Sequence, residues 1–105
     1  MARLYISGPV TGIEDDNIDA FIAAHERLED AGHTATVPHS FIAPGVSWGM
    51  AMAVCINRLT VNDGALMLYD GVAMLPGWEN SRGAKLEKAV AEACGMECRP
   101  LEGWL

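Results

Sequence analysis

Residues 75–87 (LPGWENSRGAKLE) constrain the fold of this chain more than any other stretch. An apolar run stops at Pro76 and Gly77, a short polar loop follows, and a pattern typical of an amphipathic helix begins near Ser81. This order predicts a strand, a loop and a helix, and ligands of α/β domains bind where such loops leave the carboxyl ends of the strands. The helix start also offers unpaired backbone N–H groups and a positive dipole end, which favour an anion such as a phosphate.

Glu87 is the residue of this stretch with the clearest chemical potential. It stands four residues after Gly83, so it lies one turn along the predicted helix and can face back toward the loop. The helix N-terminus should hold its pKa low, so that an ionised carboxylate is available to attack a sugar carbon. The alternative is an ordinary acidic residue that the helix dipole favours by roughly 0.3–1 kcal/mol, which is the commoner reason for a lone Glu at such a position.

The composition limits the classes of function. The 105 residues are half hydrophobic, which predicts one globular domain, residues 1–105, with one core. The formal net charge of −7 opposes binding of a nucleic-acid polymer, whereas a small phosphorylated ligand needs only local donors. No segment is long and apolar enough to span a membrane, and the N-terminal apolar run is too short for a signal peptide, so we expect a cytoplasmic protein.

Neither the cysteines nor the histidines show the spacing of metal ligands. Cys94 and Cys98 are four residues apart, but Gly95 should end the helix between them. We therefore expect reduced, buried thiols, no bound metal and no cofactor. The residues concerned are Cys55, Cys94, Cys98, His25, His33 and His39.

Apolar runs bounded by turn signals alternate with helical patterns, which predicts a parallel sheet with right-handed crossovers and helices on both faces. The expected domain is a small doubly wound α/β fold, flavodoxin-like or Rossmann-like, with about four strands. Its first and third strands should be neighbours, so that the loops after Ser7 and Leu75 face one another. The expected strands are residues 3–7, 34–37, 71–75 and 96–101, and the expected helices cover residues 18–28, residues 50–69 with a break near residues 62–64, and residues 81–94.

The buried face of the last helix can be predicted from its apolar periodicity. Five apolar residues recur at helical spacing, and we expect them to pack on the sheet: Leu86, Ala89, Val90, Ala93 and Cys94.

Two motifs together resemble a known superfamily. One is the opening YISGPVTG (residues 5–12), and the other is LPGWE (residues 75–79) followed by Ser81-x-Gly83-x-x-x-Glu87. This combination resembles the nucleoside 2-deoxyribosyltransferase-like superfamily, in particular its short bacterial and phage members that are known only as a domain of unknown function. The Ser-x-Gly-x-x-x-Glu core is similar to the catalytic segment of the 2′-deoxynucleoside 5′-phosphate N-hydrolases.

The resemblance implies roles for individual residues. The position of the catalytic nucleophile falls on Glu87, and Ser81 and the Gly83 backbone fall on positions that hold the sugar or its phosphate. A second acid of the family assists the nucleobase. Counted back from Asp70, its position falls on Asn62, and we take Asp63, one residue further on, as the proton donor.

The remaining predicted substrate contacts come from the two loops and the helix start. Trp78 could stack on a base or pack in the core, and Arg82 could pair with a phosphate or remain a solvated charge. The full predicted substrate-binding set is Tyr5, Ser7, Gly8, Thr11, Gly12, Trp78, Ser81, Arg82 and Gly83.

Three hypotheses for function follow from these residues. The first is cleavage of an N-glycosidic bond, or deoxyribosyl transfer, on a nucleoside or nucleoside 5′-monophosphate, in which a carboxylate captures an oxocarbenium-like sugar. The second is nucleotide binding without turnover, and the third is an interaction module on the same fold. A homodimer with a shared site is also predicted, both from the resemblance and because residues 50–59 are apolar almost all round the expected helix.

Overall fold

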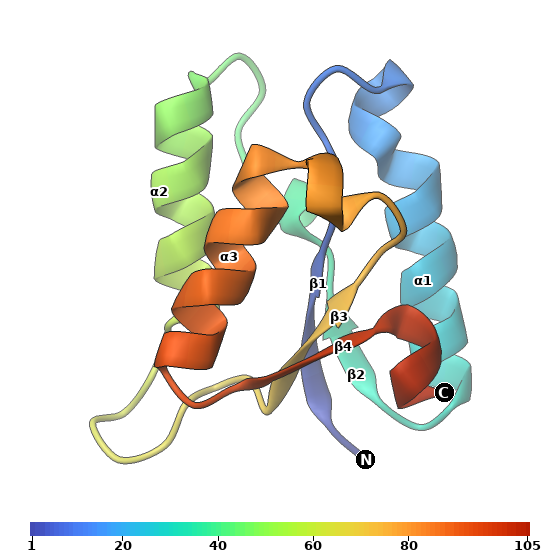
Figure 1. Ribbon diagram of the computed structural model, residues 1–105, viewed down its shortest axis with the longest axis vertical. Helices are drawn as coiled ribbons and strands as arrows, with labels where there is room; N and C mark the ends of the chain where they lie inside the picture. Colours follow the sequence, from blue (N-terminus) through green and yellow to red (C-terminus); the bar gives the residue numbers. More distant parts are fainter.

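Four parallel strands form the centre of the computed structural model, which describes residues 1–105 (Figure 1). The strands are β1 (Arg3–Ser7), β2 (Thr34–Thr36), β3 (Gly71–Met74) and β4 (Glu97–Pro100), in the order β2-β1-β3-β4. β1 pairs with both β2 and β3, so the predicted adjacency of the first and third strands is confirmed. This all-parallel order, with helices on both faces, is that of a small flavodoxin-like fold.

The helices divide between the two faces of the sheet. Helix α1 (Ile18–Asp30) packs on one face, against β1 and β2. Helices α2 (Trp48–Leu59) and α3 (Arg82–Ala93) pack together on the other face, where α3 contacts β1, β3 and β4 (Figure 1). No helix has the length and apolar character that crossing a membrane requires.

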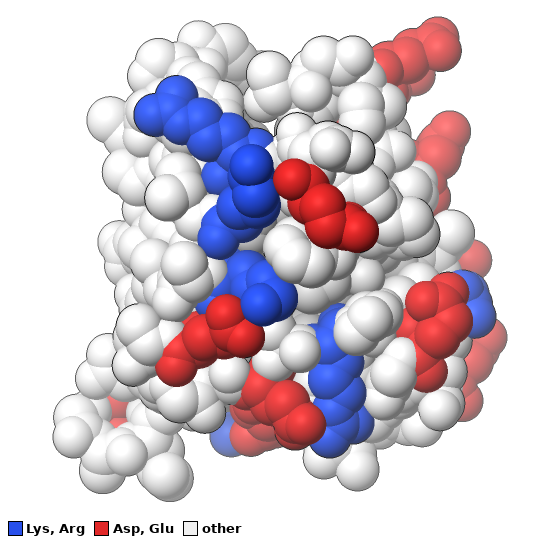
Figure 2. All heavy atoms as spheres, in the orientation of Figure 1, with Lys and Arg blue, Asp and Glu red and all other residues white.

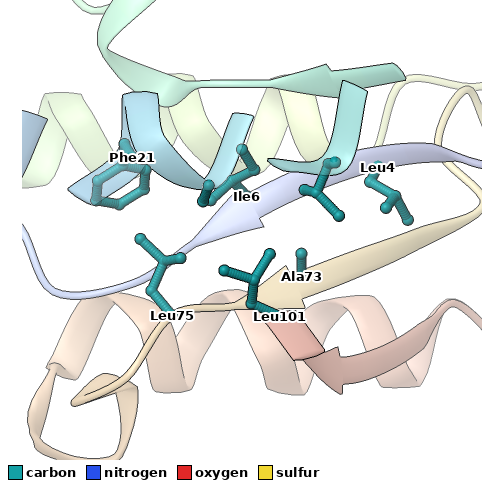
Figure 3. Close-up of a cluster of buried hydrophobic side chains, with 8 residues drawn as sticks. Leu4, Ile6, Phe21, Ala73, Leu75 and Leu101 are labelled. Carbon is teal, nitrogen blue, oxygen red and sulfur yellow. The ribbon is translucent and has the colours of Figure 1, made fainter. Parts of the chain in front are cut away.

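Alternation along β1 divides its side chains between these two faces. Leu4 and Ile6 belong to a buried cluster with Phe21 of α1 (Figure 3). Tyr5 belongs to the cluster beneath α2 and α3, and Ser7, two residues further on, points to the same face. The strand therefore presents two hydroxyl groups to the inner surface of α3.

The segment after α2 differs from the expected helix. α2 ends at Leu59, and residues 60–69 run through a turn closed by an antiparallel bridge between Asn62 and Met67. The prediction that residues 50–69 are mostly helical is therefore wrong beyond Leu59. The physical reason is the Asn-Asp-Gly sequence, whose side chains accept backbone N–H bonds and compete with the helical ladder.

The buried face of α3 also differs from the prediction. Ala84, Glu87 and Ala91 face the sheet, whereas Leu86 is 43% exposed. Ala89, Ala93 and Cys94 are exposed as well, and Val90 is half-buried. The apolar periodicity was misleading because Glu87 occupies an inward position, which becomes favourable only when the buried carboxyl finds hydrogen-bond partners.

Candidate functional site

A cavity of about 930 Å³ lies at the carboxyl ends of β1 and β3, where the sequence predicts a ligand site. The loops after these strands supply residues 8–11 and 75–77 of its wall, and the start of α3 supplies residues 80–84. The start of α2 and the first turn of α1 close the other sides. Glu87 is the only Asp or Glu among the lining residues.

The Glu87 carboxyl is held by two hydroxyl groups from β1. The Tyr5 hydroxyl donates to Oε2 at 2.5 Å, and the Ser7 hydroxyl donates to Oε1 at 2.9 Å. Only 6% of Glu87 is exposed, and it lies in the wall of the cavity one turn inside α3. Both oxygens therefore have a fixed orientation, which favours a defined chemical role over that of a solvated acid.

Burial raises the pKa of Glu87 above its ordinary value, although the hydrogen bonds from Tyr5 and Ser7 lower it in part. The prediction of a low pKa is therefore wrong in direction, because the cost of removing water from the charged form outweighs its stabilisation by the two hydroxyl groups. Burial, followed by the Glu87 charge, also raises the pKa of Tyr5 far above its usual range. Tyr5 consequently remains a hydrogen-bond donor to Glu87 at any physiological pH.

Cys55 is a cavity residue that the sequence interpretation did not place in the site. It lies on α2, is 7% exposed, and lines the cavity that Glu87 also lines. Burial raises the pKa of its thiol, so the thiol stays protonated at neutral pH. Of the three thiols predicted to be buried, Cys55 alone is; Cys98 is half-buried and Cys94 is exposed, because α3 turns that position toward solvent.

The N-terminus of α3 forms the polar rim of the cavity. The Ser81 hydroxyl accepts a hydrogen bond from the Ala84 N–H at 3.2 Å and caps the helix. The N–H groups of Arg82 and Gly83 lie in the first turn, where no intrahelical acceptor exists. The Arg82 guanidinium stacks 4.3 Å from the centre of the Trp48 ring, so the starts of α2 and α3 meet at the rim.

Basic side chains lead toward this rim. Three of the seven Lys and Arg residues of the chain lie on α3, three positions apart: Arg82, Lys85 and Lys88. Figure 2 shows them as a blue run over this helix. Lys88 pairs with Glu92 at 3.0 Å, whereas neither Arg82 nor Lys85 has an acidic partner. Arg82 is the one Lys or Arg residue that lines the cavity, so the start of α3 is the source of positive charge at the rim.

The first loop contributes through close packing. A methyl group added at Gly8 would lie 2.7 Å from the Cβ of Leu75, so only glycine lets the two loops approach this closely. Gly8 and Thr11 line the cavity, but Gly12 does not. Trp78 does not line it either, since it packs against the cluster beneath α3 and under the Lys88 ammonium. Two amide side chains that were not predicted as site residues also line the cavity: those of Asn17 and Asn80.

The predicted proton donor Asp63 is not brought to this cavity. Its carboxylate is fully exposed and accepts the backbone N–H groups of Ala65 and Leu66, at 2.9 and 2.7 Å. These hydrogen bonds lower its pKa, which favours the ionised form and opposes proton donation. Asp70 accepts the Arg3 backbone N–H at 2.7 Å, so it has a structural role at the start of β3.

The described residues thus combine a buried carboxyl group, a rim that carries the Arg82 guanidinium and free N–H groups, and a cavity of ligand size. No group of three His, Cys, Asp or Glu side chains is arranged to hold a metal ion. Such a site can hold a small molecule by its anionic group at the rim while presenting a carboxylate to its interior.

Residues 2–99 match the family described as Domain of unknown function (DUF4406), and the chain belongs to this family. Neither the curated proteins nor the solved structures contain a match to the chain. The matched range includes the loop after β1, the loop after β3 and Glu87.

Proposed function

We propose that this member of the DUF4406 family cleaves the N-glycosidic bond of a nucleoside 5′-monophosphate, with Glu87 as the nucleophile. The observation that carries the proposal is a buried carboxylate in a cavity wall, oriented by the Tyr5 and Ser7 hydroxyls. The motifs that resemble the nucleoside 2-deoxyribosyltransferase-like superfamily support the same conclusion, as they contribute Tyr5, Ser81, Gly83 and Glu87. A nucleotide substrate also fits the cytoplasmic location that we propose.

The chemistry proceeds in two displacements. Glu87 attacks the anomeric carbon as the bond to the base nitrogen breaks, and an ester joins the sugar to the carboxylate. The base leaves with its bonding electron pair and acquires a proton. Water then attacks the same carbon, which frees Glu87 and gives the sugar phosphate; a second base in place of water gives deoxyribosyl transfer.

The environment of Glu87 suits these steps. Two hydroxyl donors hold the ionised carboxylate, and burial strips it of the water that would otherwise weaken its attack. As positive character develops on the sugar, the adjacent negative charge becomes more favourable than it is in the ground state. Turnover should therefore increase with pH as Glu87 ionises, through an apparent pKa above the ordinary carboxyl value of about 4.3.

The rim provides the recognition of the 5′-phosphate. The N–H groups at the start of α3 and the Arg82 guanidinium supply donors, and the unpaired Lys85 adds positive charge nearby. An anion approaching a negatively charged protein is attracted only where such a local cationic field exists. A nucleoside without the phosphate should therefore bind more weakly.

We also propose a homodimer, because α2 and α3 leave apolar side chains exposed beside the cavity. Met50 is 54% exposed, Leu86 43% and Trp48 37%. A second copy covering these neighbouring helices would bury them and narrow the cavity mouth. A side chain from that copy is one source of the proton for the departing base, and water is the other.

Nucleotide binding without turnover is the second candidate, and a specific observation favours it. No Asp or Glu other than Glu87 lines the cavity, so this chain offers no second carboxyl to protonate the base. In this case Glu87 would accept a hydrogen bond from a sugar hydroxyl.

Incubation with a panel of deoxynucleoside and ribonucleoside 5′-monophosphates separates the two candidates. Release of free base, measured by chromatography and absent without protein, supports turnover. Saturable binding in calorimetry with no base released supports the binding protein. If no nucleotide binds or reacts, both candidates fail.

A further inference from the structure

A second cavity of about 510 Å³ lies over the open edge of the sheet at β2. Its walls come from α1, from the end of β2 and the turn after it, and from the last turn of α2, and it shares no lining residue with the first cavity. No Asp or Glu lines it, although the chain has 14 acidic and only 7 basic residues. Arg58 and two histidines do line it.

Arg58 is held in place without an acidic partner. Its Nε donates to the Tyr69 hydroxyl at 2.9 Å, and its guanidinium carbon lies 5.8 Å from the Phe41 ring centre and 6.0 Å from that of Tyr69. No carboxylate forms a salt bridge with it. The two terminal nitrogens of the Arg58 guanidinium therefore remain available to a ligand, and the aromatic contacts orient the guanidinium before the ligand binds.

Two hydroxyls and two imidazoles complete the polar lining, those of Thr36, Ser40, His25 and His39. The Ser40 hydroxyl donates to the Val37 carbonyl at 2.7 Å. The Tyr69 hydroxyl donates to Thr36 Oγ1 at 3.0 Å, which leaves the Thr36 hydroxyl proton free to donate. His39 Nε2 lies 2.7 Å from the Asp16 carbonyl and so carries a proton, while its Nδ1 is buried without a partner. His25 lies 3.3 Å from Glu29, which is itself outside the lining.

The remaining lining is apolar. Ile18 and Ile22 of α1 contribute aliphatic surface, and Ile22 is 45% exposed in the absence of a ligand. Ligand cavities of this size typically combine such a surface with a few fixed polar groups.

We propose that this second cavity binds a small organic anion, whose phosphate or carboxylate group meets the free nitrogens of Arg58 and the Thr36 hydroxyl. The apolar body of the anion lies over Ile18 and Ile22. The proposal is independent of the nucleotide site, because it uses none of the residues that line the first cavity. Phosphate and carboxylate share this recognition chemistry, since a planar guanidinium fork matches both.

Nuclear magnetic resonance of the labelled full chain tests the proposal with three probes. Phenyl phosphate and benzoate carry an anion on an apolar ring, and benzyl alcohol is a neutral counterpart. We expect saturable shifts of the Thr36, Ile22 and Arg58 signals with at least one anion and not with the alcohol. The stronger of the two anions identifies the preferred group. Shifts confined to the first cavity, equal shifts with the alcohol, or no saturation would overturn the proposal.

Two variants, each with a matched control, assign the binding to Arg58 and to the apolar wall of the second cavity. Arg58→Gln should abolish the shifts, whereas Arg27→Gln, on the outer surface of α1, should leave them unchanged. Ile22→Glu places a carboxylate in the groove at an exposed position and should weaken binding by about tenfold, because like charges then meet. Ala23→Glu adds the same charge one residue away at an exposed position outside both cavities, and should change affinity by less than about twofold. Equal effects of the two Glu variants would overturn the proposal even if Arg58→Gln fails to fold.

Discussion

Replacing Glu87 by Gln removes the charge of the buried carboxyl while keeping its size and its capacity for hydrogen bonds. Moving an ion out of water costs several kcal/mol, and each hydrogen bond to a charged group returns about 1.5–3 kcal/mol. Glu87 has two such bonds, yet burial still dominates, as its raised pKa shows. Glu87→Gln should therefore increase the free energy of unfolding at pH 8 by about 1–3 kcal/mol, a gain often seen when a functional charge is removed.

The difference in stability between Glu87→Gln and the wild type should depend on pH, and the direction of this dependence follows from the pKa of Glu87. In the unfolded chain Glu87 titrates near its ordinary value of about 4.3, and in the folded protein its pKa is higher. The stability that the protonated carboxyl contributes is complete below about pH 4.3 and is lost as pH rises through the folded-state pKa. Gln does not titrate, so the difference between variant and wild type should be small at pH 4 and largest at pH 8.

Urea denaturation followed by circular dichroism at pH 4, 6 and 8 measures this difference directly. In thermal unfolding of a chain of this length, a change of 1 kcal/mol in stability corresponds to a shift in Tm of roughly 4–8 °C. Glu92→Gln is the matched control, since Glu92 lies on the same helix with its side chain 52% exposed and should change stability little. A Glu87→Gln protein that is less stable at pH 8, or a difference that does not vary with pH, would refute the argument from burial.

Three further predictions concern packing, recognition and assembly. Gly71→Ala should lower the free energy of unfolding, measured in urea, by about 1–3 kcal/mol, because the added methyl group would lie 2.6 Å from the Trp104 indole. A methyl group added by Gly49→Ala meets nothing within 4 Å, so this control should stabilise α2 by about 0.5–1 kcal/mol. Ser81→Ala removes a helix cap worth about 1 kcal/mol. In calorimetry this variant should narrow the difference in affinity between nucleoside monophosphates and nucleosides. Equal affinities of the wild type for both classes of ligand would exclude an anion site at the start of α3. Leu86→Glu, and likewise Met50→Glu, should convert the proposed dimer to a monomer in sedimentation velocity, and a wild-type monomer at micromolar concentration would rule the dimer out.

The adjacency of β1 and β3 and the location of the cavity could be predicted from the sequence, because the alternation of strand and helix signals along the chain indicates a doubly wound sheet. The turn at Pro76 and Gly77 ends a buried strand, and parallel strands place such turns at one edge of the sheet. The distance from Gly83 to Glu87 placed the carboxyl one turn into the helix, where the structure has it.

The environment of Glu87 could not be predicted in the same way, since it depends on contacts between distant parts of the chain. Tyr5 and Ser7, which hold its carboxyl, lie 82 and 80 residues earlier in the sequence. When these two partners are not known, the apolar residues around Leu86 are expected to form the buried face of α3. A low pKa is then also expected for Glu87. Asp63 was misplaced for a different reason: its turn-forming neighbours engage the carboxylate locally and hold it at the surface.

Intact-protein mass spectrometry during turnover tests the nucleophilic role of Glu87 most directly. The protein is mixed with a deoxynucleoside 5′-monophosphate that the activity panel identifies, quenched in acid within seconds, and digested to locate any modification. The account predicts a deoxyribose phosphate ester on Glu87 in the wild type, with free base released, and neither product from Glu87→Gln at equal nucleotide binding. Release of base by Glu87→Gln at the wild-type rate, or an adduct on any residue other than Glu87, would contradict it.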